Sequence, residues 1–294
     1  MIYTGLLLLV TIIWGSTFVI IKDTVTSINP FFIVFSRTFI AAISMLLIVF
    51  LKNKQALFHR HTIFQGSLLG LLLATTYASQ TYGLKFTSSG HSGFITGSAV
   101  ILVPLILYLF LKETITRATL FSVCIVFCGL FFLAFDTKTA INIGDIITLL
   151  TACSYAIHII LSGRFVKKTD ALSLIAYQFV FACLFSFIAL LFTKNFPQSI
   201  SIKSYTSILY LGFVGTLFCY FISVWSQKYV DSIKVIVIFS LESVFAALFG
   251  YLVYKEVLVG RELLGAGMIL SGVLFYQLQK YFKFFNNSSI SSGT

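Results

Sequence analysis

Charged residues are scarce in this sequence. They make up 10% of the 294 residues, whereas a typical soluble protein has about 25%. Only 9 of them are acidic. A water-soluble exterior cannot be built from so few charges, and 59% of the residues are hydrophobic. Lipid must therefore cover most of the surface, which indicates an integral membrane protein.

Signals for enzyme chemistry, metals and nucleic acid are also missing. No Walker A sequence is present, so this chain does not use ATP, and no HExxH-type spacing is present for a metal-dependent intramembrane enzyme. The 5 cysteines all fall inside apolar runs and are interpreted as core residues. The net charge of +11 comes from Lys and Arg spread thinly over connections, not from a basic patch. We expect no cofactor, no metal and no nucleic-acid partner.

Long apolar runs fill the rest of the chain. About 20 apolar residues suffice to cross a bilayer, and each run is expected to be a helix because an open sheet edge cannot face lipid. The connections between the runs are short, so no soluble domain is inserted. The ten predicted spans are residues 4–22, 30–51, 63–83, 91–111, 118–135, 145–163, 171–193, 204–226, 233–254 and 260–280.

An internal repeat organises these spans. The stretches His91–Glu113 and Lys234–Glu256 share an outline, and each ends in a Lys-Glu pair. Five spans precede Asp136 and five follow Asp145, so the second copy enters the membrane from the opposite side. The sequence thus predicts an all-α membrane protein with two inverted five-helix repeats, a 5+5 arrangement typical of secondary transporters that bind substrate near the midplane.

The predicted domains are a first repeat at 1–137, a second repeat at 138–281 and a polar tail at 282–294. The connections on the N-terminal side of the membrane carry more Lys and Arg than those on the opposite side. By the positive-inside rule, both termini are expected in the cytoplasm.

Short sequence motifs in four spans carry a family resemblance. They are Trp14–Phe18 (WGSTF), Arg37, Gly93–Gly97 (GFITG) followed by Val103-Pro104-Leu105, and Leu241–Val244 (LESV) with Gly250 and Glu256. With these residues the chain resembles the EamA-type transporters of the drug/metabolite transporter superfamily over nearly its whole length. The resemblance implies a ten-helix transporter of small metabolites, often amino acids or related compounds, with a central cavity. Ser243 and Tyr155 depart from the family pattern, which commonly has Pro and Trp there, and they leave the substrate open.

Three ionisable residues lie deep in predicted spans. Arg37 is expected to bind a carboxylate or phosphate through its fork of donors; a structural clamp or snorkelling to the interface is the alternative. Glu242 is the acidic residue placed deepest and the candidate for proton coupling or charge balance, against a neutral carboxyl hydrogen-bonded between helices. His158 either contacts substrate and protons or packs between helices.

Polar aromatic, amide and hydroxyl side chains inside the spans are expected to line a cavity. Each of them could instead serve in packing or in an interfacial belt. Gly93 and Gly97 allow close helix approach and Pro104 removes a helical hydrogen bond, so all three are candidate gating or hinge residues, with static packing as the alternative. The predicted substrate-binding residues are Trp14, Thr17, Arg37, Tyr77, Gln80, Thr96, Tyr155, His158, Gln178, Tyr220 and Trp225.

These patterns predict a secondary active transporter of the bacterial inner membrane, not an enzyme. We expect it to export a small polar or amphipathic metabolite, such as an amino acid or related compound, by alternating access. Its partners would be that substrate, the lipid bilayer and protons, and it would act as a monomer or homodimer. The alternatives are an exchanger or importer of a larger host-derived metabolite (nucleoside-like or sulfonium), an intramembrane enzyme, and a non-transporting membrane scaffold.

Overall fold

Helices dominate the computed structural model, which describes residues 2–52, 60–134, 142–194, 196–255, 260–279 and 289–290. The helices are α1 (Ile2–Thr24), α2 (Pro30–Lys52), α3 (Arg60–Gly83), α4 (Ser89–Gly97), α5 (Ala99–Leu111), α6 (Arg117–Ala134), α7 (Ile143–Phe165), α8 (Ala171–Thr193), α9 (Ile202–Tyr210), the π-helix η2 (Leu211–Phe218), α10 (Cys219–Ser226), α11 (Ser232–Phe239), α12 (Leu241–Tyr254) and α13 (Gly260–Leu278). Two short strands, β1 (Ile115–Thr116) and β2 (Ser289–Ile290), pair antiparallel.

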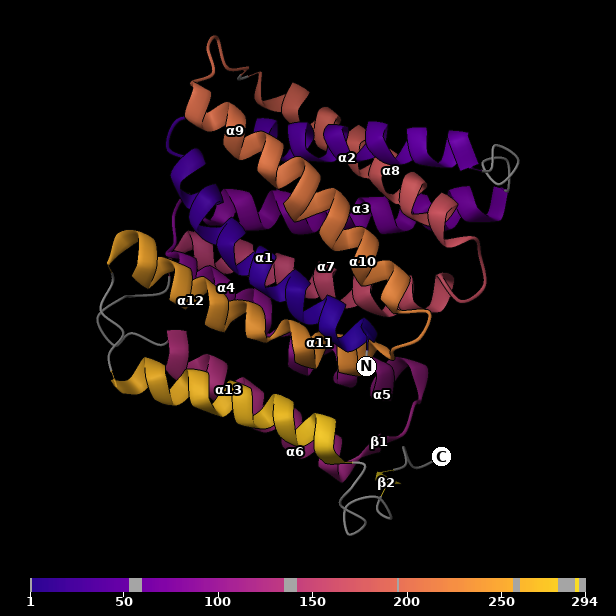
Figure 1. Cartoon of the computed structure of the whole chain (residues 1–294), viewed down its shortest axis with the longest axis vertical. Coiled ribbons are helices and arrows are strands. Elements are labelled where there is room, and N and C mark those ends of the chain that lie inside the picture. The colour runs from indigo at the N-terminus through magenta and orange to yellow at the C-terminus, as the bar shows by residue number, and fades with distance from the viewer. Residues whose placement is uncertain are drawn as a thin grey trace.

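Every predicted span contains helix. Within the described residues, 7 helical stretches have the length and apolar composition of a membrane span, and α6 contains a shorter apolar helix. A mostly helical, multi-pass membrane protein is therefore confirmed. Ten crossings in a 5+5 arrangement stay a prediction. The chain order agrees with an even number of crossings, since α1 begins and α13 ends on the same side of the bundle (Figure 1).

The fourth and ninth predicted spans are each interrupted at a serine. Ser98 separates α4 from α5, and Ser240 separates α11 from α12. Both spans also end on a lysine in the left-handed backbone region, with φ of 51° at Lys112 and 54° at Lys255. The two spans therefore resemble each other in backbone geometry as well as in sequence.

Pro104 does not account for these interruptions by itself. It lies inside α5, beyond the break at Ser98. The break at Ser240 occurs in a stretch without proline. The proline therefore removes one backbone hydrogen bond from a span that is already divided at Ser98. Its role as a hinge stays a prediction.

Helices of the two predicted repeats interlock. The most extensive contacts pair α6 with α13, α3 with α7 and α8, α2 with α8, and α1 with α12. In Figure 1, α6 and α13 lie together at one end of the molecule, α2, α8 and α9 lie at the other end, and α1, α4, α7 and α12 lie between them. The halves are thus not separate lobes. The predicted boundary at 137/138, Glu256, and the tail at 282–294 apart from β2 lie outside the described residues.

Glycines permit the closest approach between α6 and α13. A Cβ atom added to Gly129 would lie 2.7 Å from the carbonyl oxygen of Gly265 and 2.8 Å from the backbone nitrogen of Ile269. Backbone atoms cannot swing aside as a flexible side chain can. Glycine at 129 is therefore required for this helix pair to meet at its present distance.

We expect Gly129→Ala to destabilise the protein by about 1–3 kcal/mol, the usual cost of overpacking a close-packed site. Thermal unfolding of the purified protein in detergent measures the effect. Gly267→Ala on α13 is the matched control, because a Cβ atom there would meet nothing within 4 Å. Equal melting temperatures for the two variants would contradict the packing described for Gly129.

Candidate functional site

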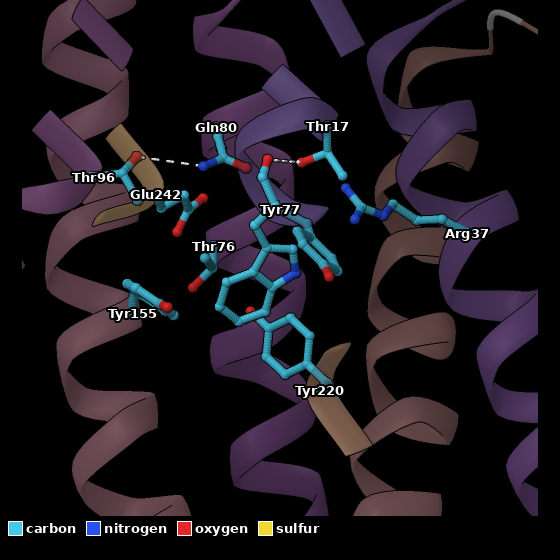
Figure 2. A pocket seen from close by; sticks show the side chains of 10 residues that line it. Thr17, Arg37, Thr76, Tyr77, Gln80, Thr96, Tyr155, Tyr220 and Glu242 are labelled. Atoms are coloured by element: carbon cyan, nitrogen blue, oxygen red, sulfur yellow. Dashed lines mark hydrogen bonds between the residues drawn. The ribbon is translucent and has the colours of Figure 1, made fainter. Parts of the chain in front are cut away.

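A pocket in the middle of the bundle collects most of the residues selected from the sequence. Helices from both predicted repeats contribute to it, as Figure 2 shows. We refer to it as the central pocket. Its lining residues are Trp14 and Thr17 of α1, Arg37 of α2, Thr76, Tyr77 and Gln80 of α3, Thr96 of α4, Tyr155 of α7, Tyr220 of α10 and Glu242 of α12.

The central pocket is contracted in this structure. The volume open to the centre of a water molecule inside it is only about 20 Å³. A water molecule needs about 10–15 Å³ on the same measure. The pocket can therefore hold water but not a metabolite. A larger ligand would enter only if the surrounding helices move apart.

Arg37 supplies the positive charge of the central pocket. Its side chain is 1% exposed. Nε donates a hydrogen bond of 2.8 Å to Thr216 Oγ1, and the guanidinium carbon lies 3.8 Å from the centre of the Tyr77 ring. Nη1 has no hydrogen-bond partner, and none of the ion pairs in the described part of the chain includes Arg37. A buried cation with a free donor is well suited to bind an anionic group.

Glu242 supplies the acidic group, on the opposite side of the central pocket from Arg37 (Figure 2). It lies in the first turn of α12, directly after the interruption at Ser240, and is 9% exposed. None of the ion pairs among the described residues includes Glu242. The pocket thus has a guanidinium on one wall and a carboxyl group on the opposite wall.

Aromatic rings form the apolar walls. The Trp14 ring centre lies 5.1 Å from that of Tyr220, 5.0 Å from Phe239 and 6.1 Å from Tyr155. The rings of Tyr77 and Tyr220 meet edge to face at 5.6 Å. The hydroxyl of Tyr155 is buried without a hydrogen-bond partner. The walls can therefore accept an apolar group and still offer a hydroxyl to a polar one.

Hydroxyl and amide groups complete the lining. Gln80 Nε2 donates to Thr96 Oγ1 over 3.4 Å, and Thr17 Oγ1 donates to the Trp14 carbonyl over 2.7 Å. Thr76 was not selected from the sequence. Its position four residues before Gln80 on one helix was the available signal, because residues at that spacing share a face.

Three predicted binding residues lie outside the central pocket. His158 and Gln178 are buried and pair with each other, with 2.9 Å between Nε2 and Oε1. The centre of the His158 ring also lies 5.5 Å from that of Tyr220, which lines the pocket. Trp225 stacks on Phe221 further along α10 and does not line the pocket. Their roles in binding stay predictions, and direct contact would require another conformation.

The predicted glycine hinges pack against the span that carries Glu242. Ser243 Oγ donates to the carbonyl of Gly93 over 2.9 Å. A Cβ atom added to Gly97 would lie 3.1 Å from the same Oγ atom. These contacts show why small residues are needed where α4 meets α12. Hinge motion at Gly93 and Gly97 stays a prediction.

Known proteins resemble the whole chain. The profile of the EamA-like transporter family matches it twice, over residues 1–135 and 142–277. A protein of Archaeoglobus fulgidus named an uncharacterized transporter is 31% identical over 274 residues, covering 93% of this chain and 85% of the relative. The Bacillus subtilis uncharacterized transporter YoaV is 25% identical over 273 residues, covering 90% of this chain and 92% of its own.

A solved crystal structure shows a related fold. It superposes with a TM-score of 0.77, covering 95% of this chain and 98% of the other, at 13% sequence identity. At this identity the likeness supports the fold and gives no information about the ligand.

Proposed function

Because the chain belongs to the EamA-like transporter family, we propose that this membrane transporter moves a small zwitterionic metabolite by alternating access. The proposal places ten helices, as two inverted repeats, in a bacterial inner membrane with both termini in the cytoplasm. Two observations support it. The family profile matches each half of the chain separately, and helices of both halves line the central pocket.

The buried Arg37, which forms no ion pair with any described residue, is the observation that carries the substrate class. In a bilayer such a cation costs a few kcal/mol, and residues of this kind usually mark a substrate or ion pathway. Its free Nη1 lies in a pocket whose opposite side carries Glu242. A ligand with a carboxylate at one end and an ammonium at the other complements both walls. Amino acids and related compounds fit this description, and export is the direction that the family resemblance implies.

Contacts at both ends of α7 support alternating access. Near its first turn, Asp145 accepts a hydrogen bond of 2.5 Å from Thr87 of the first half. In its last turn, Arg164 forms a 2.7 Å ion pair with Glu113 of the first half. Opposite ends of one membrane helix face opposite sides of the membrane. Breaking one contact while keeping the other would open the contracted pocket to one side at a time.

Transport by purified protein in liposomes tests the proposal. We expect counterflow of one or more radiolabelled amino acids from a panel that also contains nucleosides, and we expect the corresponding amino acid amides not to compete, because they lack the carboxylate for Arg37. Liposomes without protein give the background. Movement of nucleosides alone, or of no compound with or without a pH gradient, would contradict the proposed substrate class.

Glu242→Gln tests proton coupling. The buried Glu242 carboxyl, which forms no ion pair with any described residue, can be neutralised by taking up a proton. We expect the variant to keep counterflow, because the glutamine side-chain oxygen can still accept a hydrogen bond from the ligand's ammonium group and counterflow needs no net proton movement, but to lose accumulation driven by a pH gradient. Glu262→Gln is the matched control, because α13 lines no part of the central pocket. If accumulation by Glu242→Gln responds to the pH gradient as in the parent, Glu242 does not couple protons.

A further inference from the structure

The π-helix η2 interrupts the span that runs from α9 to α10. In an α-helix each amide bonds to the carbonyl four residues earlier, whereas in a π-helix the carbonyl lies five residues earlier. The amide of Cys219 bonds to the carbonyls of Thr216 and Val214, so it passes over the carbonyl of Gly215. Thr216 Oγ1 also bonds to the carbonyl of Leu211, five residues earlier. Turns of this kind are rare in proteins, and those that occur often lie at functional sites.

Three side chains of the central pocket use the acceptors in this turn. Trp14 Nε1 donates to the Gly215 carbonyl over 2.9 Å, and Arg37 Nε donates to Thr216 Oγ1 over 2.8 Å. The Tyr77 hydroxyl lies 3.5 Å from the same carbonyl and 3.4 Å from Oγ1. These side chains come from α1, α2 and α3 of the first half, while the turn belongs to the second half. Gly215 and Thr216 do not line the central pocket.

The wide turn and its three partners depend on each other. In α-helical register the Cys219 amide would also bond to the Gly215 carbonyl, and the buried indole N–H of Trp14 would have to share that acceptor. The absent side chain at Gly215 matters as well. A Cβ atom there would lie 3.0 Å from Thr17 Cγ2 and 3.5 Å from Arg37 Nη2. The guanidinium therefore packs directly against the turn.

We propose that the π-turn at Gly215 and Thr216 positions the ligand-binding face of the central pocket. Thr216 fixes Nε of Arg37, which leaves Nη1 free for the ligand, and the Gly215 carbonyl fixes Trp14. Both are positioning residues that act through Arg37 and Trp14. The role of Nη1 toward substrate rests on the proposed function, whereas the anchoring itself does not. The turn belongs to the second half of the chain and the residues it holds belong to the first. When the halves move relative to each other, Arg37 must either move with Thr216 or lose its hydrogen bond to it.

The test uses two readouts that need no ligand. The chain has 2 tryptophans, so Trp225→Phe leaves Trp14 as the single fluorescent reporter. In this background, full-length protein is purified in lipid nanodiscs with Thr216→Val or Thr216→Ser. Phenylglyoxal labelling of the Arg37 peptide is followed by mass spectrometry, and Trp14 emission and its quenching by acrylamide are recorded. Thr206→Val is the matched control, since the exposed Thr206 hydroxyl donates to the Lys203 carbonyl of its own helix.

We expect Thr216→Val to raise Arg37 labelling severalfold and to shift Trp14 emission, because the guanidinium and the turn lose their shared hydroxyl. Thr216→Ser should restore both values, and Thr206→Val should leave both unchanged. If Thr216→Val does not fold, Thr216→Ala takes its place with the same expected result, because it also removes the hydroxyl that accepts from Arg37 Nε. Unchanged labelling and emission in a folded variant would overturn the inference. If the protein moves no amino acid but labelling and emission change as expected, the proposed function fails and this inference stands.

Discussion

A guanidinium held in the membrane, with no carboxylate partner in the described part of the chain, is the constraint around which the central pocket is built. Burying Arg37 costs a few kcal/mol on insertion scales, and the chain offsets part of this with the face of Tyr77 and the hydroxyl of Thr216. One donor, Nη1, stays unsatisfied. Native structures rarely leave buried donors unpaired unless the group serves another purpose. An anionic ligand group would complete the coordination that the protein leaves open.

The same constraint explains how the two halves depend on each other. Arg37, Trp14 and Tyr77 belong to the first half, yet the π-turn that holds them belongs to the second. Glu242 enters from the second half beside the interruption at Ser240 and lies on the opposite side of the pocket. Neither half forms the site alone. The interlocking of α6 with α13 and of α3 with α7 and α8 holds these contributions in register.

The sequence predicts the site best where burial is expensive. Arg37 and Glu242 stand out because charges within apolar spans need a reason to be there. The spacing of Thr76 from Gln80 indicates their shared face, but it is not among the predicted site residues. Phe239 and the π-turn carry no such signal, because a ring on an apolar helix gives no indication of the face it occupies and hydropathy does not register one extra residue per turn. His158 and Gln178 are predicted to bind substrate, and in this structure they pair with each other next to Tyr220. The helices themselves follow from hydropathy alone, while the serine interruptions do not.

Arg37→Gln provides the most direct test of this account, with melting temperature and amino acid counterflow measured on the same preparation. A glutamine removes the buried charge and can still donate to Thr216. The account predicts a melting temperature equal to or above that of the parent, together with loss of counterflow. A large drop in melting temperature with counterflow retained would show that Arg37 is a structural clamp, and would contradict the central claim.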